Sequence, residues 1–397
     1  MSASRSASPH TVAVADQPAP PARDVDAVRD RCTRFLGWHG RPRPREVLLE
    51  LAAATPDDLR PDHYGAGAVL EDLEAQVAEL LAKPAAVFMP SGTMAQQIAL
   101  RIWADRKGVR TVAFHPTCHL ERHEDKAYEY LHGLHGRLVG DRNELITRKD
   151  LEQVREPLAA LVLELPQREL GGRLPEWDDL VAQAEWARDS GVSLHLDGAR
   201  LWETAPYYRR PYAEIAGLFD TVYVSFYKGL GGIAGCALAG PEDVIAQARV
   251  WQRRHGGSLF HLYPYALAAR AGLQQRLGRM GDYYARALEI AEALRGHPDV
   301  EVVPDPPQVP MMHLRLRISA DALREAALDL AEETGIWTFV DSAPSGSPSW
   351  RRVELTVGDA TMGFTGAEVR ELLDRLLPSS RGARGSAPAN SDGRVGG

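Results

Sequence analysis

The sequence has little cysteine, and the cysteines it has are far apart. Three cysteines, Cys32, Cys118 and Cys236, occur in 397 residues, and no two of them form a CxxC pair. Neither a disulfide framework nor a structural zinc site is therefore indicated. Scattered thiols of this kind are typical of a reducing compartment, so we expect a cytoplasmic protein.

Long apolar runs and an excess of positive charge are also missing. No stretch reaches the roughly 18 apolar residues of a membrane-spanning helix, and the N-terminus lacks the apolar core of a secretory signal. Lys and Arg number 46 against 54 Asp and Glu, which gives a formal net charge of −8. We therefore expect neither a membrane protein nor a general nucleic-acid binder, and look for a small-molecule partner.

The composition that remains is that of a soluble enzyme, with 44% apolar and 25% charged residues. The length favours two or three compact units. Residues 1–24 and 379–397 are rich in small residues, Pro or Gly, and we expect both to be disordered tails. Between them the composition indicates an N-terminal arm at 25–60, a large domain at 61–245, and a helical bridge with a small domain at 246–378.

Apolar runs alternate with helical periodicities between the tails, a pattern typical of a parallel sheet covered by helices. In the large domain we expect strands at residues 85–89, 111–114, 159–164, 192–196, 221–226 and 235–239. We expect helices at 69–82, 93–104, 177–189 and 242–254, and one long helix at 264–295. Strands at 300–303, 311–318, 336–340 and 351–357 and helices at 320–333 and 366–377 follow. The fold class is α/β, with a large, mostly parallel sheet and a smaller C-terminal α+β domain.

The first of three candidate stretches is Ser91-Gly92-Thr93, between a strand and a helix. Ligands of an open α/β sheet bind at the carboxyl ends of its strands. Free backbone N–H groups and the positive end of the helix dipole favour a phosphate there. An ordinary helix cap would read the same way, because Ser and Thr are preferred capping residues.

The second and third stretches also follow apolar strands. Asp197 ends one strand, and Arg200 stands three residues later. A carboxylate there can pair with a protonated ring nitrogen and an arginine can grip a carboxylate, although a structural ion pair would look the same. Lys228 follows the next strand and precedes a run of glycines. It can form an imine with an aldehyde cofactor or simply extend into solvent.

Together the three stretches indicate pyridoxal 5'-phosphate (PLP), held in the fold type I manner. They offer a phosphate-binding turn at Ser91-Gly92-Thr93, an acid for the pyridine nitrogen in Asp197, and a lysine some thirty residues later in Lys228. The chain also resembles the threonine aldolase family, or aromatic amino acid β-eliminating lyases, over about residues 62–257, with a looser match beyond. The motifs that carry the resemblance are Tyr64-Gly65, Leu73-Glu74, FMPSGTMA at 88–95, LHLDGARL at 194–201 and SFYKGLG at 225–231.

The resemblance implies a role for each matching residue near the cofactor. Lys228 would hold PLP, and Asp197 would partner its pyridine nitrogen. His119 resembles the histidine that stacks on the cofactor ring, with Glu124 in the place of a nearby family glutamate. The cofactor-binding set would be Ser91, Gly92, Thr93, His119, Asp197, Arg200, Ser225 and Lys228.

Further residues are implied on the substrate side. Arg200 and Arg352 resemble the ligands of the substrate carboxylate, although Arg351 is the immediate neighbour of Arg352. The family usually has Glu-Asn-Thr-His-Asn where this chain has Glu164-Leu165-Pro166-Gln167-Arg168, so Gln167 replaces a histidine and Arg168 adds a cation. The family's early Ser-Asp-Thr-Val-Thr segment is also replaced, by FLGWHGRP at 35–42.

The function that this resemblance implies is retro-aldol cleavage of a β-hydroxy-α-amino acid, like L-threonine, to glycine and an aldehyde. With Gln167 in place of the histidine, the base for the hydroxyl proton is His119, His123, the cofactor phosphate or a water. The alternative on the same scaffold is β-elimination, transaldol exchange or racemisation. The resemblance also implies a homodimer or homotetramer with shared active sites, in which Arg253 or Arg254 reaches a neighbour's phosphate.

Two interpretations from other classes fit less well. A metal cluster would draw on His115, His119, His123, His132 and His135. No second dense set of ligands accompanies these histidines, and we expect no metal. Residues 229–234 formally match the dinucleotide pattern G-x-G-x-x-A, but the segment after them resembles a strand rather than a phosphate-binding helix.

Overall fold

The central feature of the structure is a seven-stranded sheet. The computed structural model describes residues 23–377. The strands of this sheet are β2 (Ala85–Met89), β3 (Thr111–Phe114), β4 (His135–Leu138), β5 (Ala160–Glu164), β6 (Ser193–Gly198), β7 (Thr221–Ser225) and β8 (Cys236–Gly240). Their order is β2-β8-β7-β6-β5-β3-β4, and only β8 runs antiparallel to its neighbours. The predicted α/β class with a mostly parallel sheet is confirmed.

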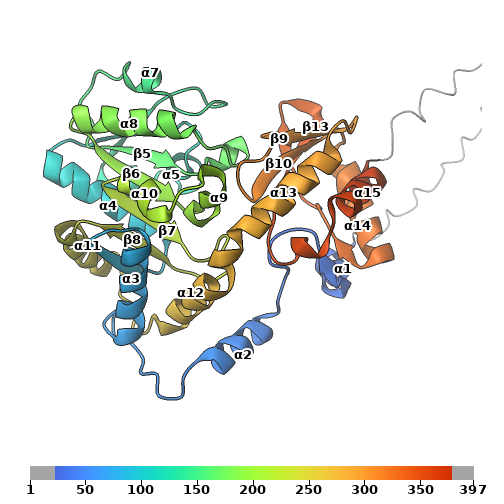
Figure 1. Cartoon of the computed structure of the whole chain (residues 1–397), viewed down its shortest axis with the longest axis horizontal. Helices are drawn as coiled ribbons and strands as arrows, with labels where there is room; N and C mark the ends of the chain where they lie inside the picture. Colours follow the sequence, from blue (N-terminus) through green and yellow to red (C-terminus); the bar gives the residue numbers. More distant parts are fainter. Residues whose placement is uncertain (1–22, 378–397) are drawn as a thin grey trace, which may run out of the picture.

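Both faces of the sheet are buried under helices (Figure 1). Side chains alternate between the faces along each strand. In β2, for example, Val87 and Met89 join one apolar cluster, whereas Ala86 and Phe88 join the other. The covering helices are α3 (Ala68–Leu80), α4 (Gly92–Lys107), α8 (Trp177–Asp189) and α11 (Glu242–Arg254). A sheet covered on both sides leaves its strand ends as the place for a ligand.

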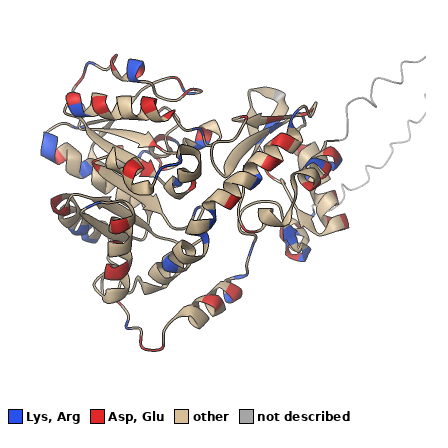
Figure 2. Cartoon of the chain, in the orientation of Figure 1, with Lys and Arg blue, Asp and Glu red and all other residues tan. Residues whose placement is uncertain are grey.

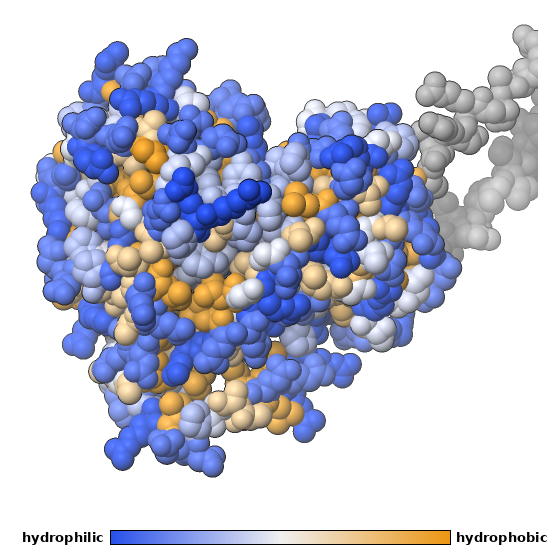
Figure 3. Space-filling view, viewed as in Figure 1, coloured by the Kyte–Doolittle hydropathy of each residue, from blue (hydrophilic) through white to orange (hydrophobic). Residues whose placement is uncertain are grey.

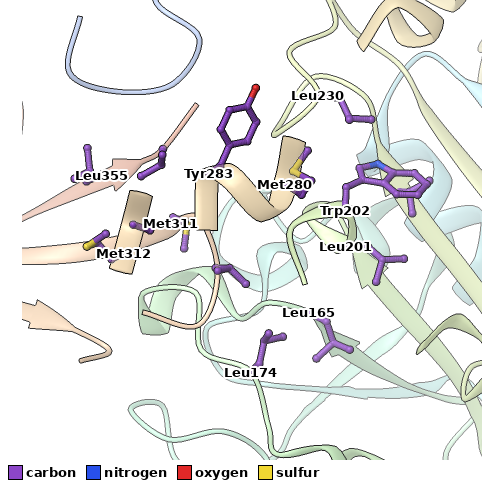
Figure 4. Close-up of a cluster of buried hydrophobic side chains, with 14 of the residues drawn as sticks. Leu165, Leu174, Leu201, Trp202, Leu230, Met280, Tyr283, Met311, Met312 and Leu355 are labelled. Carbon is purple, nitrogen blue, oxygen red and sulfur yellow. The ribbon is translucent and has the colours of Figure 1, made fainter. Parts of the chain in front are cut away.

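A smaller unit lies beside the large sheet and includes a four-stranded antiparallel sheet of order β12-β13-β10-β9. Its strands and helices are β9 (Val300–Val303), β10 (Met311–Leu316), α14 (Ala320–Thr334), β11 (Ile336–Trp337), β12 (Ala343–Ser345), β13 (Ser347–Thr356) and α15 (Gly366–Leu376). The helix α13 (Met280–Leu294) runs between the two units in Figure 1. Apolar side chains from both, such as Leu165, Trp202, Met311 and Leu355, meet at the junction (Figure 4).

The single helix predicted at 264–295 is wrong. The chain forms α12 (Tyr263–Arg276), a 3-10 turn at Leu277–Arg279 and then α13. Gly278 favours a break because glycine is a poor helix former. Arg276 and Arg279, on either side, both bind the carboxylate of Asp359, so a tertiary contact holds the turn.

The N-terminal segment joins the small unit. Asp24 caps α1 (Val25–Arg31), and Arg23 pairs with Asp329 at 2.6 Å. The predicted tails otherwise lie outside the described residues. β1 (Arg34–Phe35) pairs with β11, and the strand predicted at 336–340 is short because this partner has only two residues. The chain then forms α2 (Pro44–Ala54), which has no buried residue.

The remaining short helices surround the large sheet. They are α5 (His119–Arg122), α6 (Ala127–His132), α7 (Arg148–Leu151), η1 (Arg168–Leu170), η2 (Leu201–Glu203), α9 (Ala205–Tyr208), α10 (Tyr212–Gly217) and, in the small unit, η4 (Thr361–Gly363). Acidic and basic side chains are interspersed over the helices (Figure 2). Within residues 23–377, no helix is long and apolar enough to cross a membrane.

Candidate active site

Three neighbouring parallel strands end at one pocket. Glu164 of β5 lies beside Asp197 of β6 in the sheet register, and Asp197 lies beside Tyr223 of β7. Lys228 follows three residues after β7. The pocket has a volume of about 290 Å³. Its lining residues are Trp38, Thr93, Gln96, His119, His123, Glu124, Glu164, Arg168, Asp197, Ala199, Arg200, Tyr223, Tyr227, Lys228 and Glu354.

Asp197 is buried at the base of this pocket and is only 1% exposed. Its Oδ2 accepts a hydrogen bond from Gln96 Nε2 at 2.7 Å, and its Oδ1 accepts one from the Ala199 N–H at 3.2 Å. Neither donor is charged. Burial raises the pKa of Asp197, because desolvation disfavours the carboxylate. A cation bound in the pocket would offset that cost.

The first turn of α4 forms another wall. Ser91 precedes the helix without capping it through its side chain, and Thr93 lines the pocket. The first N–H groups of a helix have no acceptor within it, so they are available to an anion. A Cβ at Gly92 would overlap the hydroxyl of Tyr223, so the close approach of α4 to β7 requires glycine at this position.

Lys228 is half-buried in the loop after β7, with its Nζ 5.1 Å from the ring centre of Tyr227. Burial lowers the pKa of Lys228, and Arg200 and Arg168 lower it further. The loop is held from the N-terminal segment, because His39 Nε2 lies 2.9 Å from the carbonyl oxygen of Gly229. A lysine whose ammonium form is disfavoured is a better nucleophile near neutral pH.

His119 stands at the start of α5, and its Nδ1 lies 2.9 Å from Oε1 of Glu124. This hydrogen bond raises the pKa of His119. Glu124 is buried and also accepts from Gln97 Nε2 at 3.3 Å. The two residues that the sequence paired are therefore in contact, with the ring beside the pocket.

Arginines and glutamates cross between the two units on the other side of the pocket. Arg168 Nε lies 2.8 Å from Glu354 Oε2, and Arg200 Nη2 lies 3.3 Å from Glu354 Oε1. Arg352 Nη2 lies 3.1 Å from Glu169 Oε2. The two arginines expected to bind a substrate carboxylate are thus held by carboxylates of the chain itself.

Gln167, which replaces the family histidine, is turned away from the pocket. It is 3% exposed and donates from Nε2 to Thr117 Oγ1 at 3.3 Å and to Glu164 Oε2 at 3.2 Å. Burial and the neighbouring Asp197 raise the pKa of Glu164 to about 8, which favours its protonated form.

The structure therefore gathers most of the predicted residues. Lys228, His119, Asp197, Thr93, Arg200 and Arg168 line the one pocket. Ser91, Gly92, Ser225, Gln167 and Arg352 are not among its lining residues. Ser225 is fully buried and donates from Oγ to the Ala199 carbonyl oxygen at 2.7 Å.

Several lining residues were not singled out from the sequence. Gln96 lies one turn into α4, and its contact with Asp197 depends on the tertiary structure. Glu354 could have been found from the sequence. Residues two apart on a strand share a face, and Arg352, two residues before Glu354, was already a candidate. Trp38 lies in the segment noted only as a departure from the family pattern.

The two less favoured interpretations can now be compared with the structure. His115 bonds Thr117 and backbone carbonyls, whereas His132 stacks on His255 at 5.0 Å. Among residues 23–377, the metal-ligand type atoms that come within 4.8 Å of one another belong to Cys118, Glu164 and Asp197 instead. The glycines at 229–235 lead into β8, not a helix, so the dinucleotide motif lacks its structural context.

Comparison with solved structures defines the class of fold. Serine palmitoyltransferase from Sphingomonas wittichii, at 14% identity and a TM-score of 0.64, shares the fold. A candidate L-allo-threonine aldolase from Listeria monocytogenes is 44% identical, with a TM-score of 0.84 over 88% of this chain and 97% of that one. A candidate β-eliminating lyase/threonine aldolase from Exiguobacterium is 41% identical, with the same TM-score over 89% and 98%. The fold is that of the fold type I PLP enzymes.

The family follows from the sequence comparisons. The model of the β-eliminating lyases matches residues 45–317, and the chain belongs to this family. Low-specificity L-threonine aldolase 1 from Arabidopsis thaliana is 27% identical over 79% of this chain and 87% of its own length. The aldolase vrtJ from Penicillium aethiopicum is 34% identical over 63% of this chain and 66% of its own. The predicted family and its enzyme class, the threonine aldolase-like lyases, are confirmed.

Proposed function

We propose that this protein is a PLP-dependent lyase that cleaves the Cα–Cβ bond of a β-hydroxy-α-amino acid to glycine and an aldehyde. One observation carries the proposal: Lys228, Asp197 and the first turn of α4 surround one pocket at the carboxyl ends of β5, β6 and β7. The membership of the β-eliminating lyase family supports it.

The residues present fit PLP. Asp197 is a buried carboxylate whose hydrogen-bond donors are uncharged, and a protonated pyridine nitrogen would supply the missing cation. Gln96 Oε1 is also buried and has no partner within residues 23–377. Lys228 would hold the aldehyde, Asp197 the ring nitrogen, and the first turn of α4 the phosphate. We assign the ring-stacking role to His119 and supporting contacts to Ser91, Ser225 and Arg200.

Bound PLP supplies an electron-withdrawing ring that stabilises negative charge at Cα. The chain does the rest. Arg200 and Arg352 bind the substrate carboxylate, which must replace Glu354 or Glu169 as their partner. Lys228, with its lowered pKa, can carry a proton to or from Cα. Asp197 would keep a proton on the ring nitrogen of bound PLP.

The proposal is tested with purified protein incubated with PLP. Wild type and the exposed control Lys149→Ala should show the absorption band of a lysine-bound cofactor, and Lys228→Ala should not. Addition of L-threonine, L-allo-threonine, L-phenylserine and β-hydroxyaspartate should release an aldehyde from at least one. A band without aldehyde would replace the aldolase assignment, and the lack of any band would reject the cofactor.

A second candidate is β-elimination, transaldol exchange or racemisation of an amino acid in the same pocket. The observation that favours it lies on the side of the pocket where the two units meet, which we call the substrate wall. There Arg168 lines the pocket and Gln167 is turned away. Arg168→Gln should then change the preference among β-hydroxy amino acids with neutral and acidic side chains. Equal changes in kcat/KM for all of them would show that Arg168 does not select the substrate.

We also propose that the enzyme is a homodimer or homotetramer of the cytoplasm. Leu48 and Leu49 of α2 are 60% and 57% exposed, and apolar side chains gather near α2, α3 and α12 in Figure 3. Arg253 and Arg254 line a separate cavity of about 650 Å³, where a neighbouring copy would reach them. Light scattering of wild type and Leu48→Lys tests the assembly.

The three free cysteines are buried, as suits a reducing compartment.

A further inference from the structure

We propose that His123 is the catalytic base that removes the proton from the substrate hydroxyl, and that Glu169 is the positioning residue that orients its ring. The inference rests on the proposed aldol cleavage and deepens it. The family position for a histidine near this hydroxyl holds Gln167, which is buried and bonded elsewhere. The reaction still requires a group that accepts a proton at this side of the pocket.

His123 follows α5 and lines the pocket. Its Nε2 lies 3.1 Å from Oε1 of Glu169, and its side chain is 39% exposed. No described residue forms a hydrogen bond with Nδ1. A histidine that donates one ring N–H to a carboxylate has its other nitrogen free to accept a proton. His123 therefore has an orienting partner, an available nitrogen and access to the pocket.

The position of Glu169 ties this base to the substrate. Glu169 also bonds Arg352, at 3.1 Å, and Arg168, at 3.1 Å. Burial alone would raise the pKa of Glu169, but Arg352, His123 and Arg168 outweigh it and lower the pKa. A carboxylate that stays ionised holds the histidine and the substrate-binding arginine in one set of contacts. His123 and Arg352, the residue proposed to bind the substrate carboxylate, thus contact one carboxylate, and on this ground we place the substrate hydroxyl beside His123.

Three other acid or base groups of the pocket have partners or roles of their own. His119, whose ring centre is 5.2 Å from that of His123, bonds Glu124 and is assigned to the cofactor ring. Burial and the neighbouring Asp197 raise the pKa of Glu164 and favour its protonated form. Both of its oxygens accept hydrogen bonds, from the Arg168 N–H and from Gln167 Nε2. Glu354 pairs with Arg168 through Oε2, a contact that can remain when a substrate carboxylate replaces Glu354 on Arg200. His123 is therefore the histidine of the pocket that has no assigned role at the cofactor.

The step balances without another reactant. Nδ1 of His123 takes the hydroxyl proton, and the O–H electron pair becomes the second bond of the aldehyde C=O. The Cα–Cβ bond breaks and its electron pair stays with Cα, which then takes up a proton that Lys228 carries from solvent, to give glycine. His123 returns its proton to solvent before the next turnover.

The first test uses the full chain with PLP and compares His123→Asn and His123→Gln with the exposed control His135→Asn. Both His123 variants should lose about a hundredfold or more in kcat for aldol cleavage with little change in KM. They should keep the cofactor absorption band and should still exchange the α-proton of glycine, which has no hydroxyl group. The control should match wild type in every assay.

The outcomes separate this inference from the proposed function. If wild type binds no cofactor or releases no aldehyde, the proposed function is wrong and His123 has no such role. If wild type cleaves and both His123 variants keep its kcat, or lose glycine exchange in parallel with cleavage, His123 is not the hydroxyl base.

A second measurement does not depend on turnover. Nitrogen NMR of histidine-labelled protein, with and without PLP, should show His123 protonated on Nε2 and unprotonated on Nδ1. The signal is assigned by its loss in His123→Asn. Glu169→Ala should move that signal and lower kcat by about tenfold or more. An unchanged signal and kcat in Glu169→Ala would reject the positioning role.

Discussion

The two walls of the pocket are built in different ways. The cofactor wall comes from strand ends and the first turn of α4, and its central acid, Asp197, is bonded to an amide and a backbone N–H. The opposite wall is made where the two units meet, and its charged groups bond one another across the junction, as Arg168 does with Glu354. The cofactor wall is fixed by sheet register and leaves Asp197 without a charged hydrogen-bond partner, whereas the arginines of the substrate wall are paired with carboxylates that a ligand must displace.

The largest effect is expected when the negative charge of Asp197 is removed from the cofactor wall. Asp197→Asn should keep the fold and lower aldehyde release by about a hundredfold or more, because the ring nitrogen loses its anionic partner. The exposed control Asp178→Asn should behave as wild type. Steady-state kinetics at saturating PLP check this, and full activity in Asp197→Asn would remove Asp197 from the proposed mechanism.

The close contact between α4 and β7 gives the next largest effect. Gly92→Ala should cost about 1–3 kcal/mol of stability and weaken PLP binding, because the new Cβ overlaps the Tyr223 hydroxyl. The double variant Gly92→Ala with Tyr223→Phe should recover part of the loss. Thermal unfolding and PLP titration of both single variants and the double variant measure it, and an absence of recovery would place the strain elsewhere.

Removing a charge from the substrate wall should improve substrate binding, whereas removing the charge of Asp197 should impair activity. Glu354→Gln removes the carboxylate that competes for Arg200 and Arg168, so KM for the amino acid should fall by about two- to fivefold. PLP affinity should not change. A higher KM would mean that Glu354 helps to hold the substrate instead of competing with it.

The last prediction concerns pH. The pKa of Glu164 is raised to about 8 in the folded chain, so its protonated form is favoured by folding. That contribution to stability is complete below the ordinary glutamate pKa and is lost as the pH rises towards 8. Glu164→Gln should therefore gain in Tm relative to wild type as the pH rises from 5 to about 8. The same difference at both pH values would show that Glu164 does not titrate in this range.

Much of the fold could be predicted because local patterns carry it. The helix at 177–189 and the strand at 85–89 were predicted with the bounds that the structure has, since both have apolar spacing and clear flanking residues. The break at Leu277–Arg279 has a weak local signal in Gly278, but the contacts that hold it come from Asp359, 80 or more residues away. The short strand β4 lacked a signal, as all four of its residues are exposed.

The sequence by itself determined the family and the expected place of the site at the strand ends. It also indicated Lys228 and Asp197 as the candidate cofactor-binding residues. Each of these depends on a short run of residues. Only the tertiary structure decided that Gln167 turns away, that Glu354 and Glu169 hold the arginines, and that His123 lies against Glu169. These contacts join residues from different strands and from both units. No local pattern records them, because the arginine–glutamate pairs arise only when the two units pack together, and the contacts of Gln167 and His123 join segments of the large unit that lie 46 or more residues apart.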